Sequence, residues 1–179
     1  MSRLQMVSTD PEDPALKRMF DEVRARGIAL PNLYRVLGLA PPLLRAWLDF
    51  AWPLRLQATT PRRIRELLIL RGAQVSGARY EWLHHVLMAR SAGVTHAQID
   101  ALAGWEQSAL FDAREQAVLR LAEEVTRGPA ASAACIEALK QHFSAAEIVE
   151  LTLTASFYVC VARFLQSMDV DLEQGLKDG

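Results

Sequence analysis

Cysteine is scarce in this chain of 179 residues, which contains only Cys135 and Cys160. The two lie in separate segments and form no C-x-x-C pair, so we expect reduced thiols in a cytosol that serve packing, rather than a disulfide framework. An excess of charge is also lacking, because 20 basic residues face 21 acidic ones and the net charge is −1. We therefore predict neither a nucleic-acid partner nor a membrane surface as partner.

Long hydrophobic runs are missing as well. The longest segment without Asp, Glu, Lys or Arg is Leu151–Ala162, twelve residues, whereas a membrane-spanning helix needs about 20. The N-terminal segment MSRLQMVSTDPEDP is acidic and has no apolar core of the kind found in secretory signals. These absences predict a soluble, cytoplasmic protein. The length predicts one domain over 1–179, with a helical N-terminal extension (1–58), a core (59–168) and a mobile tail from Asp169 (169–179).

The strand signal is weak, because good helix formers (Ala, Leu, Arg, Glu and Gln) dilute the β-branched residues. We therefore predict an all-α fold. Capping residues, prolines and glycines place the helices. A loop containing Pro31 and Asn32 is expected after the first helix. The predicted helices are Pro14 to Gly27 behind Asp13, Pro41 to Ala51, Thr60-Pro61 to Ser76, Arg79 to Ala92, one from the capping box Thr95–Gln98, Asp112 to Arg127, Ser132 to His142, and one from the capping box Ser144–Glu147.

Two consecutive predicted helices carry the candidate chemical groups Glu66, Glu81 and His85. On a helical wheel, Glu81 and His85 lie opposite Arg79 and Arg90, and their spacing of four residues lets the side chains meet. Together the three groups would form an acid/base set, because neighbouring carboxylates raise one pKa and hold a histidine ready to transfer a proton.

The same residues admit structural interpretations. Glu66 has Arg62 and Arg63 one turn back, so an ordinary salt bridge is the better explanation of Glu66 taken alone. Glu81 and His85 could form a helix-stabilising pair or a core histidine bonded to a carboxylate.

Two further chemistries, a metal site and a reactive cysteine, have weaker support in the sequence. Glu81-x-x-His84 matches only half of a di-iron carboxylate pattern, so no metal is predicted. Cys160 lies in the apolar run FYVCVA, where desolvation keeps a thiol protonated.

Leu83 and Leu87 fall near the arginine side of their helix, and a second subunit that covers this side would explain them.

Three segments resemble the carboxymuconolactone decarboxylase family, which includes the alkylhydroperoxidase-D-like proteins. They are RRIRELLILRGAQVSGARYEWLHHVLMARSAGVTHAQIDAL, FSAAEIVELTLTASFYVCVARFL and, as in the longer members, LPNLYRVLGLAPPLLRAWLDF. The resemblance implies an alkylhydroperoxidase-D-like helical bundle of bacterial type that assembles as trimers or hexamers, with its site close to subunit contacts.

The resemblance also indicates a branch of the family. In the peroxidase-like branch the site is a C-x-x-C pair, a histidine four residues after the second cysteine, and a glutamate on the preceding helix. That glutamate corresponds to Glu66 and the histidine to His85, but the cysteine positions fall on Ala78 and Glu81. Without the two thiols, peroxiredoxin activity by the dithiol cycle is disfavoured.

The residues that are present resemble the decarboxylase-like branch and predict a cofactor-independent carboxy-lyase acting on a small carboxylated, lactone-type metabolite. His85 is the expected acid, with Glu66 and Glu81 setting its protonation. A cation would hold the substrate carboxylate. Residues expected to bind substrate are Arg71, Arg163, Trp82 and His84. The alternative from another class is a non-catalytic oligomeric or ligand-binding member whose acid–histidine cluster only stabilises an interface.

Overall fold

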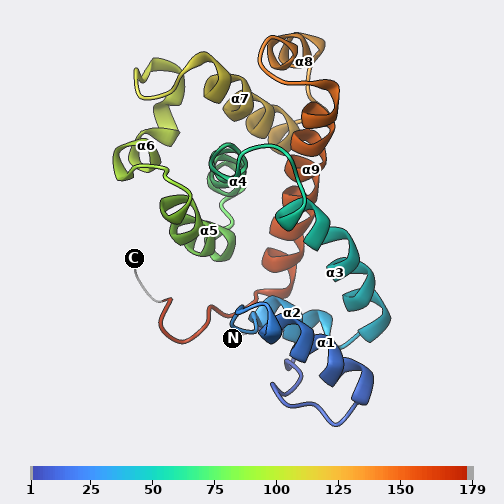
Figure 1. Ribbon diagram of the computed structural model, residues 1–179. Helices are drawn as coiled ribbons and strands as arrows, with labels where there is room; N and C mark the ends of the chain where they lie inside the picture. The colour runs from blue at the N-terminus through green and yellow to red at the C-terminus, as the bar shows by residue number, and fades with distance from the viewer. Residues whose placement is uncertain (1, 177–179) are drawn as a thin grey trace. The chain divides into compact units, whose positions relative to one another are not determined.

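The computed structural model describes residues 2–176, in which every regular element is a helix (Figure 1). This confirms the predicted all-α class. The chain divides into two compact units, one formed by residues 2–57 with 165–176, and a central unit, Ala58–Phe164.

The first unit contains α1 (Pro14–Ala25), α2 (Asn32–Leu37) and α3 (Pro41–Leu56). Asp13 caps α1 by accepting hydrogen bonds from the backbone N–H groups of Ala15 and Leu16, as predicted. The expected loop after the first helix is present and includes Pro31, but it ends there, because Asn32 begins α2, a short unpredicted helix whose apolar residues are buried. The second predicted helix runs past Ala51 to Leu56, with Pro53 inside it.

The segment from Asp169 makes specific contacts in its described part. The Asp171 carboxylate accepts a hydrogen bond from the backbone N–H of Ser2 at 2.8 Å, and the Glu173 carboxylate accepts one from the N–H of Asn32 at 2.7 Å. A mobile tail was predicted because the ends of a domain are commonly poorly ordered unless they are tied down, and these acceptors tie the segment to residues that are far away in the sequence. Residues 177–179 of that predicted tail lie outside the described residues.

The central unit is built around α4 (Arg62–Ser76), which packs mainly against α5 (Arg79–Ser91) and α7 (Ala113–Arg127). Figure 1 shows α4 between these two helices. The unit also contains α6 (His96–Ala101), the 3₁₀ helix η1 (Leu102–Gln107), α8 (Ala133–Lys140) and most of α9 (Ala145–Met168). One buried apolar cluster joins α4, α5, α6, η1 and α7, and its members are Leu67, Leu70, Ala89, Val94, Ile99, Leu102, Trp105, Phe111 and Leu119.

Local capping chemistry sets most helix starts in this unit. The predicted capping box between Thr95 and Gln98 is present, and Ser132 caps α8 through the N–H of Cys135. Thr60, however, is not the cap of α4, because Pro61 occupies that position. The N–H of Thr60 instead donates to Glu150 of α9 at 2.9 Å, which ties the start of α4 to α9.

The turn between α4 and α5 consists of Gly77 and Ala78. Gly77 has φ +65°, a left-handed conformation that ends α4. Residues with a Cβ atom rarely adopt this conformation, and glycine adopts it readily. The N–H of Ala78 bonds back to the carbonyl of Ala73 at 2.9 Å. This tight turn folds α5 back against α4 and so positions the two helices that carry the candidate site.

Helix α9 has 24 residues and is long and apolar enough, by length and composition alone, to cross a membrane. Within the central unit its residues Leu151, Ala155, Tyr158 and Ala162 are buried. A core helix of a globular protein has the same composition, and this burial makes that the interpretation we adopt.

Candidate functional site

Glu66 of α4 and His85 of α5 are in direct contact. The Nδ1 atom of His85 lies 2.8 Å from Oε2 of Glu66. Both side chains are buried, with Glu66 0 % and His85 5 % exposed. The sequence prediction that these groups on successive helices face each other therefore agrees with the geometry.

Arg62 pairs with the other carboxylate oxygen of Glu66. It lies one turn earlier on α4, so the salt bridge considered from the sequence is present beside the histidine contact. An arginine partner favours the ionised carboxylate, which can only accept hydrogen bonds. We therefore assign the Nδ1 proton to His85, donated to Glu66, which makes Nε2 the ring atom that takes up or releases a proton.

Glu81 lies one turn before His85 on the same buried side of α5 and is 2 % exposed. Neither of its carboxyl oxygens has a hydrogen-bond partner among the described residues. Burial raises the pKa of the Glu81 carboxyl well above its usual range, since the charged form would lose its hydration. Glu81 thus shares the buried face with His85 but is not hydrogen-bonded to the Glu66–His85 pair.

Two neighbours of the pair were missed from the sequence. The ring of Tyr158, on α9, meets His85 edge-on, with centroids 4.9 Å apart and planes at 90°. Arg65 is buried and donates from Nε to the carbonyl of Thr60 at 3.2 Å; burial, and then the neighbouring Arg62, lower its pKa. No local pattern links Tyr158 to His85, since it lies in the uninterrupted apolar run of α9.

The structure does not bring Arg71 to the Glu66–His85 pair. Its guanidinium binds the carboxylate of Glu123 on α7, with Nε at 2.6 Å from Oε1, and also Gln74. Trp105 donates to the same oxygen of Glu123 at 2.9 Å. Burial alone would raise the pKa of Glu123, but the hydrogen bonds from Trp105 and Arg71 outweigh it and lower that pKa. Arg71 is therefore part of a largely buried ion pair between α4 and α7.

The other predicted substrate-binding residues have separate environments. Trp82 is partly buried and packs against two apolar clusters of the core. His84 stacks on Tyr80 one turn earlier, with centroids 4.3 Å apart, and its Nδ1 lies 2.8 Å from the carbonyl of Tyr80. Arg163 is exposed on α9. These positions give Trp82 a packing role and leave substrate binding by His84 and Arg163 as predictions.

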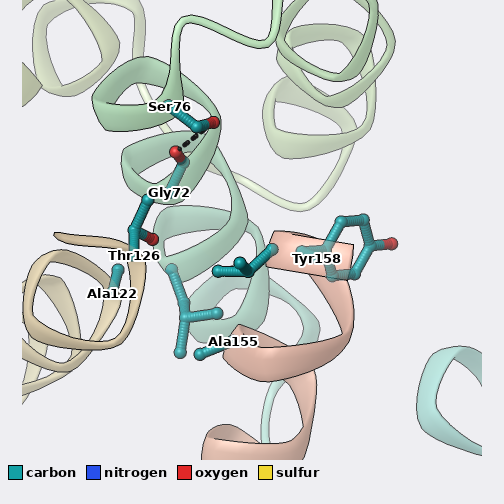
Figure 2. A pocket seen from close by; sticks show the side chains of 8 residues that line it. Gly72, Ser76, Ala122, Thr126, Ala155 and Tyr158 are labelled. Carbon is teal, nitrogen blue, oxygen red and sulfur yellow. Dashed lines mark hydrogen bonds between the residues drawn. The ribbon is translucent and has the colours of Figure 1, made fainter. Parts of the chain in front are cut away.

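Among the described residues of the central unit, neighbours of the Glu66–His85 pair line two hollows. A cavity of about 10 Å³, room for about one water, is lined by residues that include Gly72, Thr126 and Tyr158. In Figure 2 the hydroxyl of Tyr158 points away from Gly72 and Thr126. The second is an open depression of about 500 Å³, and Arg62, Leu87, Met88, Ser91 and Ala92 line it. Arg62 thus belongs both to the buried pair and to this open surface.

The cysteines lie on other helices than Glu66 and His85. Cys135 of α8 is fully buried, and burial raises its pKa to about 11, so very little thiolate forms near neutrality. Cys160 is exposed on α9. Ala78 and Glu81, at the positions where the peroxidase-like branch has cysteines, are both buried. Within residues 2–176, no group of three His, Cys, Asp or Glu side chains is arranged to hold a metal ion.

Solved structures share this fold. A peroxidase-related protein from Silicibacter sp. TM1040 aligns with a TM-score of 0.83 at 18% identity, covering 97% of this chain and 92% of its own. A peroxidase-related protein with the alkylhydroperoxidase AhpD core, from Ralstonia eutropha JMP134, gives 0.81 at 19% identity, covering 98% and 94%. The debrominase Bmp8 gives 0.78 at 19% identity, covering 92% and 89%.

Sequence comparison gives the family. No curated protein matches the chain. The sequence pattern of the carboxymuconolactone decarboxylase family matches residues 41–124, which contain Glu66, Glu81 and His85. The AhpD-like neighbours agree with this match in fold. Residues 41–124 therefore belong to the carboxymuconolactone decarboxylase family, and the sequence lacks the C-x-x-C pair.

Proposed function

We propose that this protein is a cofactor-independent lyase of the decarboxylase type, which acts on a small carboxylated, lactone-type metabolite by acid/base catalysis. The contact between Glu66 and His85 supports this proposal, because it holds the imidazole in one tautomer. The debrominase Bmp8, in a cysteine-to-alanine variant, was solved in complex with 2,3,4-tribromopyrrole. A small ring as ligand of a related fold is in keeping with a lactone-sized substrate.

The observation that carries the proposal is the buried carboxyl of Glu81, which has no hydrogen-bond partner among the described residues. Burying a polar group without a partner destabilises a fold by about 1–3 kcal/mol. A cluster that only stabilises the protein would give this carboxyl a donor. A site that must present an acid to a ligand accounts for it, because the ligand supplies the partner.

The reaction can be derived from these groups. When the carbon–carbon bond to the substrate carboxylate breaks, carbon dioxide leaves and the electron pair stays on the ring carbon. His85 donates the proton at Nε2 to that carbon, while the Glu66 carboxylate at Nδ1 stabilises the imidazolium before transfer. Solvent then returns a proton to Nε2. Because burial raises the pKa of the Glu81 carboxyl well above its usual range, this group carries less negative charge beside His85 than an exposed glutamate would, and it opposes the approach of an anionic substrate less.

A second candidate is a non-catalytic oligomeric member of the family. The burial of Glu66, Glu81 and His85 favours it, since an active site needs access for its substrate. Leu87 is 55 % exposed, which supports a homo-oligomer with a subunit contact beside the depression that Leu87 lines. Peroxidase activity stays disfavoured, because Ala78 and Glu81 replace the thiols.

The lyase proposal also includes a cytoplasmic location, a small-molecule carboxylate as partner, and assembly as a trimer or hexamer.

The test begins with a thermal-shift screen of carboxylated lactones, and a turnover assay is then run on those that stabilise the protein. We expect His85→Ala to abolish turnover and to leave the oligomer intact in size-exclusion chromatography. His96→Ala is the matched control, because His96 lies on the exposed surface. Loss of the oligomer in His85→Ala, or turnover equal to that of the unchanged protein, would contradict the proposal.

A further inference from the structure

Arg62 connects the buried Glu66–His85 pair with the open depression on the surface of the central unit. We propose that Arg62 binds the carboxylate of the substrate in this depression, which makes the depression the entrance to the acid/base pair. This inference rests on the proposed function and names the substrate-binding cation that the sequence did not identify. The Arg62 side chain is 32 % exposed, whereas the Glu66 side chain beneath it is fully buried.

The other arginines of α4 are engaged elsewhere, and Arg63 binds the Glu115 carboxylate and the backbone carbonyl of Gly93. Arg71 is 8 % exposed at its side chain, and its guanidinium is engaged by Glu123 and Gln74. Arg65 is 6 % exposed and holds the backbone carbonyl of Thr60. Arg62 combines contact with the Glu66 carboxylate and exposure to solvent, so a substrate anion can approach its guanidinium from outside.

The lining of the depression indicates the kind of ligand. Leu87, Met88 and Ala92 form apolar walls, and the Sδ atom of Met88 lies 3.5 Å from Nη2 of Arg62. The hollow of about 500 Å³ falls within the range of small-molecule sites, about 300–1,000 Å³. A planar guanidinium at the edge of an apolar hollow matches a small carboxylate with an apolar ring or chain.

Binding at Arg62 would also change the acid/base pair. A substrate carboxylate competes with Glu66 for the guanidinium, so the negative charge of Glu66 is compensated less by Arg62 and more by His85. The imidazolium form of His85 then becomes more favourable, which prepares the proton that the reaction consumes. Arg62 would therefore act as a binding residue for the substrate and as a positioning residue for His85.

The experiment measures binding and needs no turnover. γ-Butyrolactone-γ-carboxylate is the charged probe and γ-butyrolactone the neutral one, both titrated by calorimetry at constant ionic strength into the full chain. We expect the unchanged protein to prefer the carboxylate by about tenfold or more, as one charge-assisted hydrogen bond provides. Arg62→Gln should lose this preference, and Arg62→Lys should keep part of it. Arg90→Gln, which removes an exposed arginine from α5, should keep all of it.

A second measurement monitors the effect on His85. We expect the carboxylate probe and Arg62→Gln each to raise the His85 pKa, observed by NMR of its imidazole. The inference is overturned if the unchanged protein binds neither probe or binds both equally, or if Arg62→Gln keeps the preference. If circular dichroism shows that Arg62→Gln does not fold, the test uses the folded Arg62→Lys variant instead. An undiminished preference of Arg62→Lys for the carboxylate probe then overturns the inference. Carboxylate binding at Arg62 without any turnover would contradict the lyase proposal and leave this inference standing.

Discussion

Replacement of Glu81 by glutamine tests the strongest electrostatic feature of the site. Glu81 is buried and its pKa is raised well above the ordinary value, so the folded protein holds this proton to a higher pH than the unfolded chain does. The stabilisation from the protonated form is complete below the unfolded pKa, about 4.3, and is lost as the pH rises toward the folded-state pKa. In that window each pH unit lowers the free energy of unfolding by about 1.4 kcal/mol. Glutamine has nearly the same shape and does not titrate, so Glu81→Gln should lose this dependence.

The assay is urea denaturation at a series of pH values between 5 and 7, where other groups titrate alike in both proteins. The difference in unfolding free energy between Glu81→Gln and the unchanged protein should grow in favour of the variant by about 1.4 kcal/mol per pH unit, until the folded-state pKa is reached. Glu106→Gln is the control, because Glu106 is exposed on η1, and its difference should stay constant. Parallel pH profiles for Glu81→Gln and the unchanged protein would refute the argument that Glu81 is a desolvated acid.

Three further variants test other parts of the structure. Arg71→Ala should lower the unfolding free energy by about 3 kcal/mol, because it leaves the largely buried Glu123 without its main cation, yet carboxylate binding should persist; a loss of binding with stability intact would show that Arg71 serves the substrate. Gly77→Ala should cost about 1 kcal/mol in urea denaturation, since its φ of +65° disfavours a side chain, and an unchanged midpoint would contradict this. We expect little thiol-dependent peroxide reduction, and changing both Cys135 and Cys160 to alanine should not alter it; a robust rate that the double variant loses would reverse our assignment of these thiols.

Local signals in the sequence predicted most of the helices. Asp13, Thr95 and Ser132 each cap the helix start that their position predicts, because capping depends on residues within one turn. The helical wheel likewise placed Glu81 and His85 on the buried side of α5, since a period of 3.6 residues fixes which side chains share a face. Features that depend only on neighbours along the chain were therefore predictable without a structure.

The sequence did not predict contacts between partners that are distant in sequence. Arg71 was a candidate for substrate binding because it lies on the same helix as Glu66, and no spacing rule connects it with Glu123, its partner 52 residues away on α7. Tyr158 was missed for the same reason, since it reaches His85 from α9. The short helix α2 forms because tertiary contacts bury its apolar residues, and this outweighs the turn tendency of Pro31 and Asn32. Long-range contacts decide each of these outcomes.

The two-residue turn at Gly77 and Ala78 limits how homologous chains can vary here. One added residue would rotate α5 by about 100° about its axis and shift it by about 1.5 Å. A different side chain than His85 would then meet Glu66. We therefore expect family members that keep the glutamate–histidine contact to keep the length of this turn, while insertions there should accompany loss of one or both partners.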